Sequence, residues 1–434
     1  MIARLPGERI MSPNDLILFQ NIGLSDADTG GQTSTVGEPS LANNGQQIFM
    51  TGNWYATRSL DNGASWDFVS PFNFLPPVDG GFCCDQTVIY DPSRDLTCWL
   101  LQYIQDNNTN TLRVAVKQGA TLGNNDWYWW DFRPETVNSQ WTNQWFDYNH
   151  AALSNNYLYV ASNVFSTTTD QWTRSVVLRL PLDSLANQTA LNYNYFESTS
   201  NFSLRCTLGA KEVMYFGSHN TNSKIRVFSW SEIDNRVSQR DVDISPWNEG
   251  NYTAPGPDSR NWLTRTDSRI TGAWVANGAI GFMWSVNRLD GSRPFPYVRV
   301  VRLNEQSKSV IDEPDIWNPN YAFAYPDACP NDRGHLGITL FRGGGNEYPS
   351  HIVGLWDDLA NSWNLAVARQ GTHGPGDGKW GDYLTCRRHS PDGLTWVAAG
   401  YTLQGGSSRN EIEPRIVHFG RQRDQGAVSR WQNA

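Results

Sequence analysis

The chain of 434 residues lacks the features that mark several classes of protein. It has no run of Lys or Arg and a formal net charge of −9, so it has no electrostatic footprint for nucleic acid. An apolar stretch of about 18 residues is also missing, which argues against a membrane-spanning helix and predicts a soluble chain without a membrane partner. Helical periodicity is almost absent, and no paired C-x-x-C spacing predicts a zinc–thiolate site.

Cysteines are few, and their pairing is open. The six are Cys83, Cys84, Cys98, Cys206, Cys329 and Cys386. Either the adjacent pair Cys83 and Cys84 forms a local disulfide with Cys98 or Cys386, or the cysteines are buried free thiols.

Localisation is inferred, because residues 1–15 lack the apolar core of a signal peptide. Sequons that permit glycosylation in a secretory host occur at Asn107, Asn187, Asn201 and Asn251. We expect an extracellular, secreted protein.

The residues that are abundant favour β-structure. Hydrophobic residues make up 39% of the chain and are dominated by Trp, Tyr, Phe, Val and Ile, which strands prefer. The 37 Gly and 22 Pro, with frequent Asn-Gly and Asp-Gly pairs, supply the turns that many short antiparallel strands need.

A repeat runs through the chain, in which an acidic residue precedes a short apolar strand. The acids are Glu38, Asp85, Asp147, Asp267, Asp327 and Asp382, and the segment 203–208 occupies the remaining place without an acid. Seven units with a period of roughly 57 residues are typical of four-stranded propeller blades. We therefore predict an all-β, seven-bladed β-propeller of antiparallel blades, one domain over 1–434, with blades that begin near 37, 84, 146, 203, 266, 326 and 381.

Residues 15–23 (DLILFQNIG) have strand character and precede the first unit. We expect them to supply the outer strand of the last blade and so to close the ring. A pair of β-sandwiches is the alternative fold, because sandwiches also show regular strand spacing.

One segment carries a specific motif. Residues 59–66 (SLDNGASW) match the pattern S-x-D-x-G-x-x-W, in which Ser59 and Asp61 tie down a tight turn, Gly63 takes its left-handed position and Trp66 packs beneath it. This motif resembles the Asp-box of the sialidase-like family of β-propellers. In that family the box lies on the outer hairpin, away from the catalytic face, so the resemblance implies a structural role for Asp61.

The resemblance extends more loosely over the chain, through QWFDYNHAALS and PDGLTWVAAGYTLQGG. The three carboxylate-binding arginines and the Tyr/Glu nucleophile pair of sialidases are not evident. In its general look the chain also resembles the seven-bladed polysaccharide lyases of the rhamnose-glucuronate lyase group, which cut at uronic acids.

If the repeat is real, its acids face one mouth of a central channel, where like charges repel. Each must bind a cation, meet an arginine, hydrogen-bond to backbone amides or have a raised pKa. Calcium prefers oxygen ligands, so Asp85, Asp327 and Asp382 are the candidate metal ligands. The alternative is that each acid caps the turn of a neighbouring blade, and no organic cofactor is expected.

Alternation along an inner strand predicts which side chains share the channel. Residues two apart point the same way, so Asn149 and Arg269 should join Asp147 and Asp267 there. A group of arginine and asparagine side chains suits a uronate carboxylate. The predicted substrate-binding residues are Asn149, Arg205, Asp147, Asp267, Tyr383 and Arg387.

A lyase removes the proton α to the carboxylate, so it must neutralise that carboxylate and supply a base. Arg269 is assigned to the carboxylate, and Tyr148 and Tyr383 are the candidate acids. His150 and His219 are the candidate bases because their segments abut in adjacent blades, although strict alternation turns His150 toward the blade interior.

We therefore expect a monomeric enzyme that cleaves an acidic, uronic-acid-containing glycan by β-elimination. A sialidase-like hydrolase, a lectin-like propeller and a protein-interaction scaffold are the alternatives. The channel residues differ from blade to blade, which favours one site over the repeated pockets of a lectin.

Overall fold

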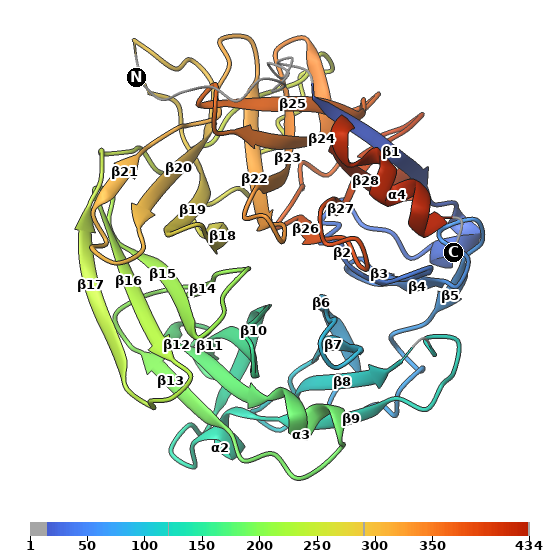
Figure 1. The fold of residues 1–434 in the computed structure, drawn as a ribbon, viewed down its shortest axis with the longest axis vertical. Helices are drawn as coiled ribbons and strands as arrows, with labels where there is room; N and C mark the ends of the chain where they lie inside the picture. Colours follow the sequence, from blue (N-terminus) through green and yellow to red (C-terminus); the bar gives the residue numbers. More distant parts are fainter. Residues whose placement is uncertain (1–14, 120, 290, 433–434) are drawn as a thin grey trace, which may run out of the picture.

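The computed structural model describes residues 15–119, 121–289 and 291–432, and shows seven four-stranded antiparallel sheets arranged in a ring (Figure 1). The prediction of a seven-bladed β-propeller is confirmed, and the alternative of two β-sandwiches is wrong. In each blade the innermost strand comes first in the sequence, and the strands follow outward in chain order. The last blade is the exception, since its outermost strand comes from the start of the described chain.

In chain order, each blade runs from its innermost strand outward. The first three are β2 (Ser40–Asn44), β3 (Gln47–Thr51), β4 (Ala56–Ser59) and β5 (Asp67–Val69); β6 (Phe82–Asp91), β7 (Leu96–Tyr103), β8 (Leu112–Gln118) and β9 (Tyr128–Phe132); and β10 (Gln144–Leu153), β11 (Tyr157–Ser166), β12 (Trp172–Pro181) and β13 (Asn194–Ser198). The next three are β14 (Arg205–Cys206), β15 (Val213–Thr221), β16 (Lys224–Ser231) and β17 (Val237–Asp243); β18 (Ile270–Ala276), β19 (Ala279–Val286), β20 (Tyr297–Asn304) and β21 (Val310–Asp312); and β22 (Ala322–Pro330), β23 (Leu336–Gly344), β24 (Glu347–Asp357) and β25 (Ser362–Arg369). The last blade comprises β26 (Thr385–Arg388), β27 (Trp396–Leu403), β28 (Ile412–Arg421) and β1 (Leu16–Gly23).

Ring closure occurs as the sequence predicts. Strand β1 pairs antiparallel with β28, from Leu16 opposite Arg421 to Gly23 opposite Arg415. The first described strand thus supplies the fourth strand of the last blade and joins the two ends of the described chain in one sheet.

Helices are short and lie between or after strands. They are α1 (Asp26–Thr29), α2 (Pro134–Val137), α3 (Leu182–Ala186), η1 (Arg409–Glu411), η2 (Gln422–Asp424) and α4 (Gln425–Gln432). None of these helices in the described chain has the length and the apolar run needed to cross a membrane.

The core lies within and between the blades, where aromatic side chains are packed. Trp99, Trp284 and Trp396 are fully buried on the second strands of three blades. Of the three neighbouring tryptophans in residues 126–132, Trp127 is buried and the other two are half-buried. Core packing is therefore the main role of these rings.

The segment 59–66 forms the turn between β4 and β5 on the outer hairpin of the first blade. Asp61 accepts a hydrogen bond from the Ser65 amide at 2.8 Å, and Ser59 Oγ accepts one from the Gly63 amide at 2.8 Å. Gly63 has φ of 85°, and the Trp66 indole donates to its carbonyl oxygen. These contacts give Asp61 a structural role.

Three innermost strands, β6, β10 and β22, contain a β-bulge near their start, in which one residue takes a left-handed conformation. Asp85, Tyr148 and Tyr325 have φ of 51°, 58° and 56°, and the pairing register shifts at each of them. A bulge adds one residue and breaks the two-residue alternation. The predicted acids are consequently not equivalent: Asp147 precedes its bulge residue, Asp85 is one, and Asp327 lies two residues beyond one.

Candidate functional site

The central channel has two ends of different chemistry. At the end where the innermost strands begin, the side chains are mostly charged. We call this end the carboxylate mouth; it comprises Glu38, Asp85, Asp147, Asp267, Asp382, Arg265 and Arg269. The mouth meets solvent at Arg265 and Asp267, whose side chains are each 44% exposed.

Two arginines share one carboxylate at this mouth. Arg265 Nη2 and Arg269 Nη2 each lie 3.4 Å from Asp382 Oδ2. Arg269 also forms an ion pair with Asp267 at 2.6 Å, and its side chain is 15% exposed. Arg269 thus faces two carboxylates and Arg265 faces one, and the guanidinium N–H groups are the charged donors that a ligand carboxylate would need.

The mouth also gathers carboxyl groups that retain protons. Burial, the charges of Asp85 and Asp382, and a hydrogen bond with Asp85 raise the pKa of Glu38 well above its usual range. Burial also raises the pKa of Asp85, although the hydrogen bond from Glu38 opposes this shift. Burial and the neighbouring charges therefore favour the protonated form of Glu38 over that of an ordinary glutamate.

Asp147 is the mouth carboxyl that titrates near neutral pH. Burial and the charge of Asp85 raise the pKa of Asp147 to about 7, against a hydrogen bond from Gln102 and the charge of Arg269. The Gln102 amide donates to Asp147 Oδ1 at 3.0 Å. A carboxyl with this pKa can both accept and release a proton at neutral pH.

A cluster of rings lies beneath the arginines. The guanidinium carbon of Arg269 lies 3.6 Å from the centroid of the Tyr148 ring. Tyr148, His150 and Tyr383 contact one another edge to face at 4.4 to 5.9 Å between centroids. The Tyr148 hydroxyl is buried and has no hydrogen-bond partner among the described residues. The structure therefore brings these predicted site residues together.

The orientation of His150 differs from the alternation argument. His150 lines a small hollow in the channel with Arg205, Tyr383 and Arg387, because the bulge at Tyr148 turns it away from the blade interior. Its Nδ1 lies 2.6 Å from Arg205 Nη1 and accepts that hydrogen bond. Burial and the charges of three arginines lower the pKa of His150 well below its usual range. The neutral ring therefore carries its proton on Nε2, as a donor.

The side chain of Asn149 does not lie where the sequence predicts it. It was predicted to face the channel, but the side chain is fully buried between blades, where its amide donates to Gln102 Oε1 at 2.7 Å. The same bulge that turns His150 into the channel turns Asn149 out of it.

His219 does not lie beside His150. Its ring packs against Trp247 and Trp284 at 4.8 and 4.7 Å between centroids, and its Nε2 lies 2.7 Å from the Ser268 carbonyl oxygen. Among the described residues, no hydrogen bond or ring contact joins the two histidines. Burial lowers the pKa of His219 to about 4, so the ring is neutral and supports the start of β18.

Asp327 lies deeper in the channel than the other acids. Its Oδ1 lies 3.0 Å from Arg205 Nη2, and its Oδ2 lies 3.4 Å from Arg387 Nη1 and accepts a hydrogen bond from the Cys386 amide at 2.8 Å. Within the described residues, Asp85, Asp327 and Asp382 are not a group whose oxygens lie within 4.8 Å of one another. The arrangement therefore does not favour one calcium ion held by all three, and calcium stays a prediction.

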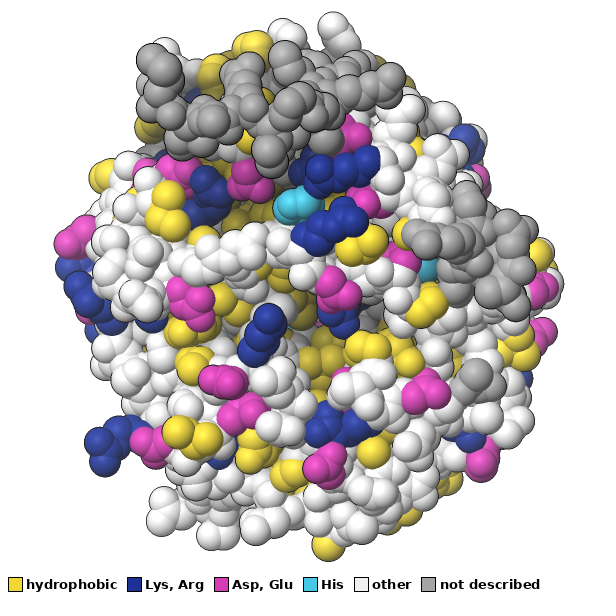
Figure 2. Space-filling model, viewed as in Figure 1, with side chains coloured by type: hydrophobic (Ala, Val, Ile, Leu, Met, Phe, Trp, Pro, Cys, Tyr) yellow, Lys and Arg dark blue, Asp and Glu magenta, His cyan; other side chains and the backbone are white. Residues whose placement is uncertain are grey.

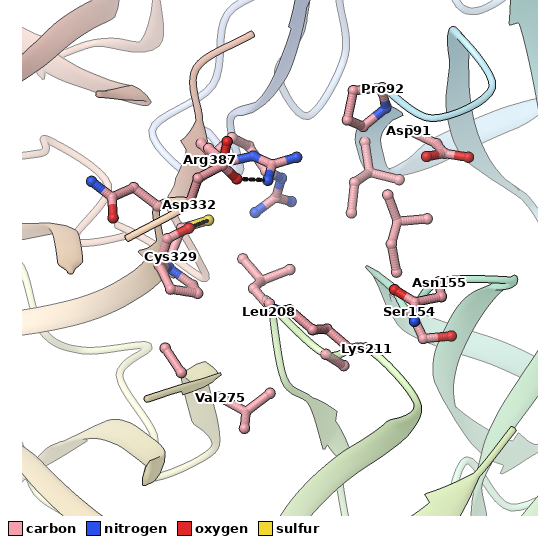
Figure 3. Close-up of a pocket in the computed structure, with 18 of the residues that line it drawn as sticks. Asp91, Pro92, Ser154, Asn155, Leu208, Lys211, Val275, Cys329, Asp332 and Arg387 are labelled. Carbon is pink, nitrogen blue, oxygen red and sulfur yellow. Dashed lines mark hydrogen bonds and ion pairs between the residues drawn. The ribbon is translucent and has the colours of Figure 1, made fainter. Parts of the chain in front are cut away.

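A second cavity lies at the other end of the channel. It has a volume of about 780 Å³ and lies where the innermost strands end. Figure 3 shows Leu208, Val275 and Cys329 among the residues that line it, together with Lys211 and Asp332, which are exposed. We call this cavity the base cavity. In Figure 2 the side chains on the face in view carry charges of both signs, interspersed rather than gathered in one basic patch.

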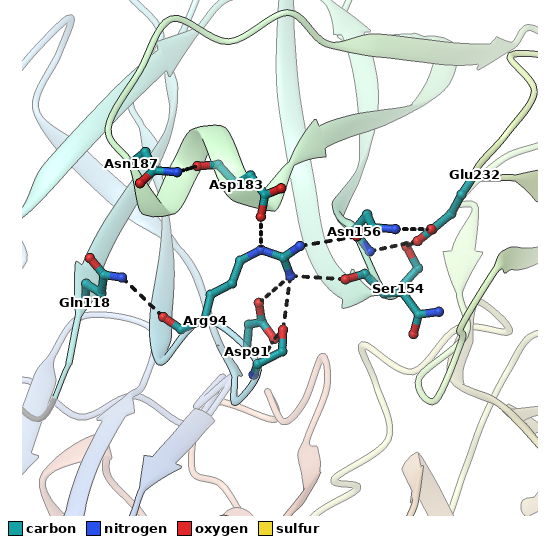
Figure 4. Close-up of polar contacts among 10 residues, drawn as sticks. Asp91, Arg94, Gln118, Ser154, Asn156, Asp183, Asn187 and Glu232 are labelled. Carbon is teal, nitrogen blue, oxygen red and sulfur yellow. Dashed lines mark hydrogen bonds and ion pairs between the residues drawn. The ribbon is translucent and has the colours of Figure 1, made fainter.

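The rim of the base cavity is held by paired charges. Arg94 donates to Asp183 at 2.5 Å, to Asp91 at 3.1 Å and to the Asn155 carbonyl oxygen at 3.1 Å (Figure 4). Asp332, which also lines the cavity, forms an ion pair with Arg388. These acids are occupied by structural contacts, whereas the mouth has a proton-holding pair and an acid with a pKa near 7. The mouth is therefore the candidate functional site.

Comparisons with known proteins bear on the fold. No family model matches the chain, and no curated protein sequence matches it. The chain is similar in fold to sialidases. A Trypanosoma rangeli sialidase in complex with the inhibitor DANA is 9% identical with a TM-score of 0.43, over 93% of this chain and 60% of that one. The NanB sialidase of Streptococcus pneumoniae is 12% identical with a TM-score of 0.43, over 78% of this chain and 68% of that one.

A lectin is similar to the same degree. The SapL1 lectin in complex with alpha methyl fucoside is 10% identical with a TM-score of 0.40, over 78% of this chain and 97% of that one. The chain spans about 60% of the length of the Trypanosoma rangeli sialidase. At these identities the likeness concerns the fold alone.

The sequence missed two features of the mouth. Arg265 lies in the long segment before β18, and no strand periodicity points to it. Cys83 and Cys84 form a disulfide with each other just before Asp85. The predicted pairing with Cys98 or Cys386 is therefore wrong. The other four cysteines are buried free thiols, as the alternative expected.

Proposed function

We propose that the carboxylate mouth binds an acidic glycan and cleaves it by β-elimination next to a uronate. The observation that carries the proposal is the conjunction of two arginines with an acid that titrates near pH 7. Arg265 and Arg269 supply the positive charge, and Asp147 lies in the same network of interacting charges as Arg269.

The arginines receive the uronate carboxylate in this proposal. Neutralising that carboxylate lowers the pKa of the adjacent C–H group, because the negative charge of the carbanion is delocalised onto the carboxyl oxygens. Asp382 and Asp267 hold the two guanidinium groups in place. The Tyr148 ring beneath Arg269 further restricts its position.

Asp147 accepts the proton and so takes the role that the sequence assigned to the histidines. Its carboxylate removes the proton α to the uronate carboxyl group, and that electron pair forms the C=C bond as the β C–O bond breaks. The leaving oxygen then takes a proton from Tyr148, the predicted acid, or from Glu38, whose pKa burial raises well above its usual range. His150 Nε2–H has no hydrogen-bond partner among the described residues and is a donor available to a ligand in the channel.

The test is a panel of uronic-acid glycans mixed with the full chain. Ultraviolet absorbance of an unsaturated uronate supports elimination, and Asp147→Asn should abolish it. New reducing ends without absorbance would assign the mouth to hydrolysis, and binding without either product would make the propeller a lectin. A chain that neither binds nor cleaves any acidic glycan contradicts the proposal.

A further inference from the structure

A cluster of two histidines and an aspartate lies in the blade that closes the ring, outside the proposed active site. His389 follows β26, Asp392 lies in the turn before β27, and His418 belongs to β28. Their side chains are 3%, 2% and 1% exposed. One ligand atom from each lies within 4.8 Å of the others, and no other such group of three occurs among the described residues.

The distances suit a shared ion. His389 Nδ1 lies 2.7 Å from Asp392 Oδ2, and His418 Nε2 lies 3.9 Å from the same oxygen. Ligand atoms around a tetrahedral zinc ion are about 3.3 Å apart, given bonds of about 2.0–2.1 Å. Shifts of about 0.6 Å bring these two distances to that value, and binding also turns the two rings so that both nitrogens point at the ion. The two imidazole rings lie nearly parallel, with centroids 4.1 Å apart.

A fourth polar atom completes the cluster. The Thr395 hydroxyl lies 2.8 Å from His418 Nε2 and donates to Asp392 Oδ2 at 2.7 Å. The backbone amides of Leu394 and Thr395 donate to the other carboxylate oxygen of Asp392 at 2.8 and 3.0 Å. The turn therefore fixes the carboxylate from one side and leaves Oδ2 facing the two rings.

We propose that His389, Asp392 and His418 bind a zinc ion. Two imidazoles and one carboxylate form a donor set that suits zinc, whereas calcium takes oxygen ligands. The ion would tie the β26–β27 turn to β28, the strand on which β1 closes the ring. This role is structural and independent of the chemistry at the carboxylate mouth.

The test measures metal content in the full-length chain by mass spectrometry. We expect one zinc per chain in the wild type and less than a tenth of that in Asp392→Asn. The matched control is His351→Gln, because His351 is equally buried and bonds to Thr339 Oγ1 at 2.8 Å, outside the cluster. This control should keep its zinc.

A second measurement covers the case in which Asp392→Asn does not fold. Treatment of the wild type with a chelator should lower the Tm, and zinc in excess of its Kd should restore it by about 5 °C, whereas calcium should not. The proposal is overturned if the wild type binds no zinc and its Tm responds to neither chelator nor zinc. It is also overturned if folded Asp392→Asn holds as much zinc as the wild type.

Discussion

The guanidinium of Arg269 lies 3.6 Å from the centre of the Tyr148 ring, and the hydroxyl of that ring has no partner among the described residues. The two side chains come from different blades, Arg269 beside β18 and Tyr148 within β10. The contact keeps an arginine and an unpaired phenol at the same mouth. Their separate roles can be distinguished by substitution.

Tyr148→Phe should reduce turnover without reducing stability. The ring and its contact with Arg269 remain, and the hydroxyl that is lost has no described hydrogen bond to break. We expect a change of less than about 0.5 kcal/mol in the free energy of unfolding by urea denaturation. If Tyr148 is the acid, kcat should fall by roughly 10²-fold or more. Unchanged turnover would remove Tyr148 from the mechanism.

Arg265→Ala should weaken binding of a uronate oligosaccharide by roughly 10- to 100-fold, because one charge-assisted contact is lost. Isothermal calorimetry measures the Kd directly. Arg369→Ala is the matched control, since Arg369 is 40% exposed against 44% for Arg265 and pairs with Glu413 on the outer part of the ring. Equal affinities in the two variants would show that the arginine at the mouth does not contact the ligand.

The raised pKa of Asp147 predicts a pH-dependent stability. The group titrates near 3.8 when unfolded and at about 7 when folded, so the folded state binds the proton more tightly between these values. Stability should therefore fall as pH rises from about 4 to about 7, by at most about 1.4 kcal/mol per pH unit from this group. Asp147→Asn should make that slope shallower, as urea denaturation across pH measures.

The control for this prediction is Asp241→Asn. Hydrogen bonding from Arg226 lowers the pKa of Asp241, so its contribution to stability is lost only as pH falls below its ordinary range. The slope between pH 4 and 7 should match that of the wild type. A wild-type slope in Asp147→Asn would show that Asp147 titrates at its ordinary pKa. In the active enzyme, kcat/KM should rise with pH toward about 7, as the carboxylate forms.

Asp327→Ala should be strongly destabilising. The carboxylate is 1% exposed and pairs with Arg205 and Arg387, which would be left as buried charges. Breaking such a pair costs about 3–5 kcal/mol, whereas breaking the Arg226–Asp241 pair on the surface costs about 0–1 kcal/mol. Urea denaturation compares Asp327→Ala with Asp241→Ala. Similar losses in both would mean that water reaches the channel pair.

The disulfide between Cys83 and Cys84 predicts a thiol count. In denaturant without reductant, four thiols per chain should react with a chromogenic disulfide reagent, because Cys98, Cys206, Cys329 and Cys386 are free. After reduction all six should react. Replacing both Cys83 and Cys84 by Ser should leave four under either condition. Six thiols before reduction would show that the pair is open.

The architecture was predictable because it repeats. Six acid-plus-strand units and one unit without the acid gave the number of blades, and the strand at 16–23 lay where ring closure needed it. Hydrophobic periodicity and turn residues act over short stretches of chain, so a single sequence is enough to detect them. The same local chemistry identified the Ser59–Asp61 turn.

The site was predictable only in part. Asp147, Arg269, Tyr148 and Tyr383 come together as expected, because each lies next to the start of an innermost strand. His219 and Asn149 do not join them. Alternation assumes a regular strand, and a bulge residue with positive φ shifts every later side chain to the other face.

The number of blades and the places where they begin follow from the sequence, because both depend on a repeated short-range pattern of an acid and an apolar strand. Tertiary structure alone decided which charges meet across the axis: Arg265 with Asp382, Asp327 with two arginines, and Glu38 with Asp85. These partners are far apart in the chain, and their contacts depend on the closure of the ring. Burial and the neighbouring charges then shift the pKa values of these groups, so the pKa of a residue cannot be known from its type alone.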